Sequence, residues 1–175
     1  MSLMLYLLDA NTLIDAKRDY FQFDRVPEFW SWIQHQGQLG NIKIPSEIYE
    51  EFEEARRNDG TRDDLSAWAS SPEVREALVL EEEVDIDMLR FVVKNGYCDN
   101  PSDEDVQRMG KDPFLISYAL RFPGLRQVVT TEASKPSAKG ANRKVPDVCK
   151  GFGITSVNNF QLISLLDFRT SWREG

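Results

Sequence analysis

The chain has 175 residues, which is the size of one domain. Hydrophobic residues make up 41% of it and charged residues 29%, which excludes a disordered chain, and the formal net charge of −8 excludes a protein that coats nucleic acid through bulk positive charge. No apolar run approaches the roughly 20 residues of a membrane helix. Cys98 and Cys149 lack the spacing of a zinc site or a disulfide scaffold. We therefore expect one cytoplasmic domain over residues 1–175, with no membrane partner.

Short apolar runs alternate with helical patterns along the chain. Residues 5–8 form a continuous apolar run typical of a strand buried on both faces. The further elements that we expect are a helix over 27–36, a strand over 42–45, a helix over 47–57 with Ser46 as its N-cap, a mostly helical stretch over 62–95, a helix over 112–122, strands over 127–131 and 154–157, and a helix over 159–168. This alternation predicts an α/β fold with a short central parallel sheet covered on both sides, and a helical insert at about 60–110.

Charge is distributed unevenly along the chain. Residues 47–105 carry a net charge of −13, whereas residues 121–150 carry +5. The basic stretch includes a polar segment over 134–144, which we expect to be a loop. Its cations Lys139, Arg143 and Lys144 are candidates for binding an anionic substrate. An ordinary solvated loop is the alternative.

Asp9 is the first candidate for a functional acid. In open parallel sheets, ligands bind at the carboxyl ends of the strands, and Asp9 directly follows the first strand. The alternative is that Asp9 caps the turn at Asn11.

The second candidate comes from the glutamate-rich helix over 47–57. Ile48, Phe52 and Ala55 define its apolar stripe, and Glu51 lies about 60° from the centre of that stripe, nearer than the other glutamates. A carboxylate at the boundary of the core is costly unless a cation or hydrogen bonds compensate it. The alternative is an ordinary surface acid.

Three more acids follow later in the chain. Asp112 lies on the same helical stripe as Leu115, although an N-cap before Pro113 would also explain it. Glu132 follows a predicted strand, so it is expected at the same sheet edge as the first acid. Asp147 is the competing candidate for a fourth acid, with the capping of a turn as its alternative role.

Carboxylates that converge on one crevice repel one another unless a cation neutralises them. Carboxylate, carbonyl and water ligands suit Mg²⁺ or Mn²⁺, and the lack of His and Cys clusters in the sequence argues against zinc. Such a cation lowers the pKa of bound water and stabilises the charge that develops during phosphodiester cleavage. Candidate metal ligands are Asp9, Glu51, Asp112, Glu132 and Asp147.

Four short motifs follow one another in chain order. They are Leu-Leu-Asp9-Ala-Asn11-Thr12-Leu-Ile, Ile-Pro45-Ser-Glu-Ile-Tyr-Glu-Glu51-Phe, Lys-Asp112-Pro-Phe-Leu-Ile and Val-Val-Thr130-Thr131-Glu132. In this order they resemble the PIN-domain nucleases, a family that includes the VapC-like ribonuclease toxins. The resemblance extends from about Leu5 to Val157. The Phe29-Trp30 pair, the helical insert and residues 145–149 resemble an uncharacterised branch often associated with toxin–antitoxin loci.

The resemblance implies a three-layer α/β/α fold and metal-dependent cleavage of single-stranded RNA. It also implies a homodimer and, for a toxin, a protein antitoxin as partner. The catalytic acids carried over are Asp9, Glu51, Asp112 and Glu132, of which the last stands where aspartate is usual. The residues that would orient ligands or water around them are Asn11, Thr130 and Thr131.

Two other interpretations compete with the nuclease. One is a catalytically weak PIN-like module that binds RNA or a protein partner, which the incomplete fourth acid and the net acidity favour. The other is a phosphohydrolase with a nucleophilic aspartate. That chemistry needs a second acid two residues after the first, where Asn11 stands, so we disfavour it.

Overall fold

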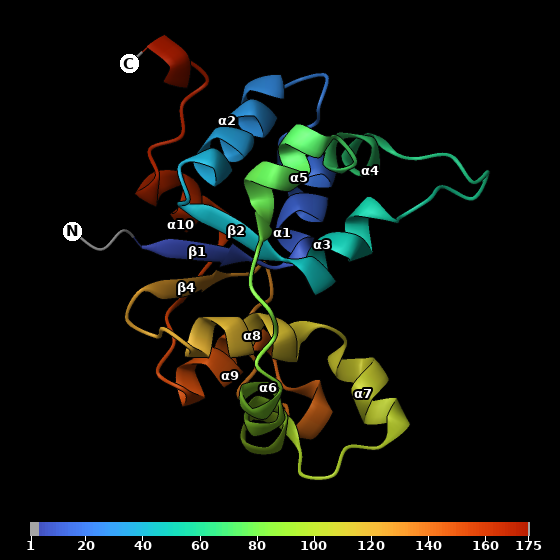
Figure 1. Ribbon diagram of the computed structural model, residues 1–175, viewed down its shortest axis with the longest axis vertical. Helices are drawn as coiled ribbons and strands as arrows, with labels where there is room; N and C mark the ends of the chain where they lie inside the picture. Colours follow the sequence, from blue (N-terminus) through green and yellow to red (C-terminus); the bar gives the residue numbers. More distant parts are fainter. Residues whose placement is uncertain (1–3, 175) are drawn as a thin grey trace.

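A sheet of short parallel strands lies at the centre of the protein. The computed structural model describes residues 4–174 (Figure 1). In that part of the chain the strands are β1 (Leu5–Leu8), β2 (Ile42–Pro45), β3 (Val79–Leu80), β4 (Arg126–Val129) and β5 (Ser156–Val157). They form one five-stranded sheet in the order β3-β2-β1-β4-β5, and every neighbouring pair is parallel. The α/β fold with a central parallel sheet, predicted from the sequence, is thus confirmed.

Helices cover both faces of the sheet, as Figure 1 shows. On one face lie α1 (Ala10–Asp15), its π-helical continuation η1 (Ala16–Tyr20), α2 (Pro27–Gln38), α3 (Ser46–Glu53), α4 (Asp64–Ala69), α5 (Pro72–Leu78) and α10 (Asn159–Leu165). On the other face lie α6 (Ile86–Val92), the π-helical turn η2 (Val93–Tyr97), α7 (Asp103–Met109), α8 (Asp112–Leu120) and α9 (Val145–Gly151). Two 3₁₀ turns, η3 (Gly140–Asn142) and η4 (Trp172–Glu174), complete the described structure. None of the helices within residues 4–174 combines the length and the apolar character needed to cross a membrane.

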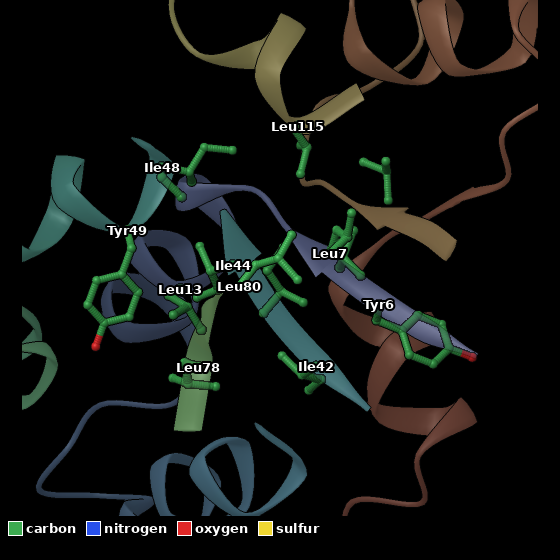
Figure 2. Packing of buried hydrophobic residues seen from close by; sticks show 14 of the residues in the cluster. Tyr6, Leu7, Leu13, Ile42, Ile44, Ile48, Tyr49, Leu78, Leu80 and Leu115 are labelled. Atoms are coloured by element: carbon green, nitrogen blue, oxygen red, sulfur yellow. The ribbon is translucent and has the colours of Figure 1, made fainter. Parts of the chain in front are cut away.

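The core is continuous through the sheet because its central strands are buried on both faces. Leu7 of β1, Ile44 of β2 and Val128 of β4 are completely buried. Figure 2 shows Leu115 of α8 on one side of these strands and Leu13 of α1 on the other. Burial on both faces explains why β1 reads as an unbroken apolar run rather than as an alternating pattern.

The register of the sheet brings distant segments to one edge. Leu8 pairs with Val129, so Asp9 and Thr130 follow their strands side by side. The Asp9 amide donates to the Val129 carbonyl at 2.9 Å. The carboxyl ends of β1 and β4, and the start of α3 after β2, therefore lie along the same edge.

Local structure differs from the sequence predictions at several points. Strand β3 lies inside the stretch that was expected to be helical over 62–95. The helix predicted over 47–57 ends at Glu53, and its N-cap is Pro45 rather than Ser46. Helix α9 replaces the turn expected there. Its first amide, Val145 N–H, donates to the Glu132 carboxylate at 2.8 Å, a contact 13 positions away that local sequence patterns do not contain.

Candidate functional site

Asp9 is a buried acid at the carboxyl end of the central strand. It occupies the N-cap position of α1, and no side-chain capping hydrogen bond is formed there. The side chain is 6% exposed, and Thr130 Oγ1 donates to its Oδ2 at 3.1 Å. Burial raises the pKa of Asp9, and the charge of Glu132 raises it further, whereas the hydrogen bond from Thr130 and the amides of Ala10 and Asn11 lower it.

Asp112 is the most strongly perturbed acid of this region. It is the first residue of α8, after the N-cap residue Lys111, so it is not the N-cap that the sequence allowed as an alternative. Burial raises its pKa to about 8, and the carboxylates of Asp9, Glu132 and Glu51 act in the same direction. Four acids from β1, α3, α8 and the segment after β4 thus share one electrostatic environment.

Glu51 is the glutamate of α3 whose charge interacts with this group. Its side chain is exposed, but partial desolvation followed by the charge of Asp9 raises its pKa, and Lys111 opposes the rise. Its neighbours are engaged elsewhere: Glu47 accepts from Tyr118 Oη at 3.1 Å, and Glu53 forms an ion pair with Arg75.

Glu132 has two roles in the structure. Its carboxylate accepts hydrogen bonds from Lys144 Nζ at 3.0 Å and from the Val145 amide at 2.8 Å, so it holds the first turn of α9. Its own amide donates to Thr130 Oγ1 at 3.2 Å. The Thr130 hydroxyl therefore connects Glu132 to Asp9, and the buried threonine fixes the spacing of the two acids.

Asp147 is directed away from the other acids. Its carboxylate accepts hydrogen bonds from Ser134 Oγ and from the Lys135 amide, the latter at 2.7 Å. The Ser134 hydroxyl, with the Lys135 amide, lowers the pKa of Asp147. Its charge is not among those that act on Asp9 or Asp112. The structure brings Glu132, not Asp147, to the acid group.

The three candidate cations have different positions. Lys144 lies beside the acids, because it is paired with Glu132 and lowers the pKa of Asp112. Arg143 donates to the backbone carbonyls of Gly96 and Asp147, which joins η2 to α9. Lys139 is exposed on the loop. Only Lys144, within the described residues, connects the basic segment to the acid group.

The remaining predicted positions lie around this edge. Asn11 is exposed on the first turn of α1, and Thr131 is half-buried and lines a cavity of about 250 Å³ together with Asn158 and Asp15. A second cavity, of about 180 Å³, is lined by Thr130, Glu132 and Asn158, among others. Asn158 thus lines both of these cavities at the carboxyl edge of β4 and β5.

The sequence analysis missed a buried polar link behind these acids. Asn159 Nδ2 donates to the Thr12 carbonyl at 2.8 Å, and Thr12 Oγ1 donates to the Val129 carbonyl at 3.2 Å. Both side chains are buried. Together they fix α10 and α1 against the end of β4. The only sequence signal was a polar pair, Asn158-Asn159, directly after a strand.

The acids do not form a preassembled metal cage. Across residues 4–174 no three His, Cys, Asp or Glu side chains are placed to hold one metal ion together. The donor chemistry still fits a hard divalent cation, because every available ligand is a carboxylate or hydroxyl oxygen. Mg²⁺ is commonly held by one or two carboxylates, with water and substrate phosphates completing its coordination. Asp9 and Asp112 could supply such a pair.

Comparison with known proteins places the chain in a family without assigning a reaction. No curated protein and no solved structure matches it. One family model matches residues 6–170, a span that runs from β1 to beyond α10 and includes all of the acids described above. The chain therefore belongs to the family described as a domain of unknown function, DUF4411.

Proposed function

We propose that the protein is a PIN-like ribonuclease that uses Mg²⁺ or Mn²⁺ to cleave phosphodiester bonds of single-stranded RNA. The observation that carries this proposal is that acids gather at one edge of the sheet, where the Thr130 hydroxyl connects Asp9 to the Glu132 amide and neighbouring carboxylates raise the pKa of Asp9, Glu51 and Asp112. Strongly perturbed acids in a shared environment are typical of functional sites, since a fold gains no stability from repelling charges. The strand order is compatible with the PIN-like part of the proposal.

Each residue has a defined task in this proposal. Asp9 and Asp112 would hold the cation, and the Thr130 hydroxyl keeps Asp9 in position. When bound, the cation supplies the positive charge that binds the scissile phosphate and favours ionisation of an attacking water. Glu51 faces solvent at the rim and, with its raised pKa, is suited to take the proton of that water. The oxygen of the water then bonds to phosphorus as the P–O bond to the leaving group breaks.

An acidic protein needs local positive charge to bind a polyanion. The cation at the acid group and the basic segment over 134–144, which reaches the site through Lys144, would provide it. We further propose, from the resemblance, that the protein acts as the toxin of a toxin–antitoxin pair, with a homodimer and a protein antitoxin as its assemblies.

A second candidate function is a catalytically weak PIN-like module that binds RNA or a protein partner. The specific observation in its favour is that Glu132 is committed to Lys144 and to the first turn of α9. A carboxylate used in this way is less available to a metal ion, and the remaining acids would have to suffice for catalysis.

RNA cleavage assays separate the two candidates. We expect Mn²⁺-dependent cleavage of a labelled single-stranded RNA, abolished by EDTA and reduced at least about 100-fold in Asp9→Asn, which keeps a hydrogen-bond acceptor for Thr130 but removes the charge. Asp24→Asn, an exposed change on the loop before α2, is the matched control and should retain activity. Cleavage that survives both EDTA and Asp9→Asn would refute the nuclease. RNA binding without cleavage would support the weak module.

A further inference from the structure

Tyr97 is a buried tyrosine whose hydroxyl has no hydrogen-bond partner in the described part of the chain. It is the last residue of η2 and is 7% exposed. Within residues 4–174, its hydroxyl is one of two buried side-chain polar atoms without a partner, the other being Gln127 Oε1. A buried hydroxyl without a partner destabilises the fold, so its presence calls for a functional explanation.

The backbone around Tyr97 is held in place by a close approach of η2 to α9. A Cβ atom on Gly96 would lie 2.8 Å from Val148 and 2.9 Å from Phe152, so only glycine fits there. Arg143 donates to the Gly96 carbonyl and to a carbonyl of α9, which fastens the two elements together. The turn η2, which ends at Tyr97, is thus fixed beside α9, and α9 also packs against α8.

Tyr97 and Asp112 belong to two elements, η2 and α8, that pack against the same helix, α9. Burial raises the pKa of the Tyr97 hydroxyl, and the charges that act on it include those of Asp112 and Glu132. Cys149 is completely buried on α9: burial, then Asp112, raises the pKa of its thiol to about 12. Both groups are therefore neutral at physiological pH, and of the two the phenol is the stronger hydrogen-bond donor.

We propose that Tyr97 is a positioning residue of the acid site, whose hydroxyl donates a hydrogen bond to the Asp112 carboxylate when that carboxylate binds a divalent cation. This inference rests on the proposed function. An ionised carboxylate has several acceptor positions, and a cation uses only some of them. A donor from the buried side fixes the orientation of the carboxylate, and such supporting hydrogen bonds commonly change metal affinity by about 10- to 100-fold.

The test compares the Mn²⁺ affinity and the thermal stability of matched variants of the full chain. For Tyr97→Phe we expect a Kd for Mn²⁺, measured by calorimetry, that is roughly tenfold weaker than that of the wild type. Its Tm in EDTA should be equal to or above that of the wild type, because the substitution removes a hydroxyl without a partner. Tyr49→Phe is the control: Tyr49 is a buried tyrosine too, but its hydroxyl donates to the Ala69 carbonyl at 2.8 Å. This control should lower Tm and leave the Kd for Mn²⁺ unchanged.

The outcomes distinguish a failure of the inference from a failure of the proposed function. If wild type and Tyr97→Phe bind Mn²⁺ equally, or if Tyr97→Phe lowers Tm as Tyr49→Phe does, the role of Tyr97 is refuted and the nuclease proposal survives. If the wild type binds no Mn²⁺ and shows no metal-dependent cleavage, the proposed function fails and the role of Tyr97 fails with it.

Discussion

Two groups of charged side chains in this protein differ in whether their charges attract or repel one another. At the start of β4, the buried Arg126 forms an ion pair with Glu82, and its Nη1 also donates to the Tyr118 carbonyl at 2.9 Å. Arg121 pairs with the same glutamate at 3.2 Å. At the carboxyl end of the sheet, neighbouring carboxylates instead raise the pKa of Asp9, Glu51 and Asp112.

The difference separates a group whose charges compensate one another from a group whose charges repel. The Glu82 group balances a carboxylate with two guanidinium groups and satisfies their hydrogen bonds, which makes buried charge tolerable. The Asp9 and Asp112 group leaves repulsion in place, which is typical of functional sites and is the basis of the proposed function. Removing a charge should therefore destabilise the first group and stabilise the second.

The largest expected effect is the loss of stability when Arg126 is removed from the group around Glu82. Arg126→Met removes the buried guanidinium and leaves Glu82 with only the more exposed Arg121, so we expect the free energy of unfolding to fall by about 3–5 kcal/mol. Urea denaturation followed by circular dichroism measures it. Arg169→Met, which breaks an exposed pair with Asp167, is the control and should change stability by less than about 1 kcal/mol. Equal effects of the two substitutions would show that the Glu82 group is not a stabilising element.

The second prediction concerns the group of repelling acids, where we expect removal of a charge to increase the free energy of unfolding. The pKa of Asp112 is about 8 in the folded protein, above the ordinary value of 3.8. The stability that its protonated form contributes is present below about pH 4 and is lost as the pH rises towards about 8. Asp112→Asn should therefore be the more stable protein at about pH 8, by more than about 1.4 kcal/mol, the equivalent of one pKa unit.

Denaturation of wild type and Asp112→Asn in EDTA across this pH window measures the effect. The difference between the two proteins should grow with pH and nearly vanish at about pH 4. A constant difference, or a destabilised Asp112→Asn at about pH 8, would mean that a neighbouring group already neutralises this acid.

The smallest effect is expected at the hydroxyl that connects two of the acids. Thr130→Val keeps the shape of the buried side chain but removes the donor to Asp9 and the acceptor of the Glu132 amide. We expect a loss of about 1–2 kcal/mol in unfolding free energy. We also expect a cleavage rate lower by roughly tenfold, because Asp9 is no longer held. Thr155→Val, at the exposed position before β5, is the control; if it matched Thr130→Val in both measurements, the connecting role of Thr130 would be wrong.

The sequence allowed the fold to be predicted where patterns are local. Residues 5–8 were recognisable as a strand because burial on both faces leaves an uninterrupted apolar run, and residues 42–45 because two isoleucines alternate with Lys43 before Pro45. Strand β3 was not, because two residues between helices provide no pattern. Helix α9 was missed because its first turn depends on Glu132, a partner outside the helix.

In the candidate site, too, the residues marked by local features could be predicted, and the contacts between distant residues could not. Asp9 and Glu51 could be selected from the end of a strand and from the angle to an apolar stripe, which are local features. The choice between Glu132 and Asp147 could not be made, because it depends on which carboxylate the loop over 134–135 engages. The ion pair of Arg126 with Glu82 could not be predicted from the sequence either, because it joins residues 44 positions apart.

The hydrogen bond between Thr130 and Asp9 has a consequence for the order in which the protein assembles. It joins residues 121 positions apart and forms only once β1 and β4 lie side by side. During synthesis Asp9 leaves the ribosome long before Thr130, so it lacks this hydrogen bond until β4 has been added. Under the proposed function, a nascent chain would therefore carry no assembled acid site, and would not cleave RNA, before that point.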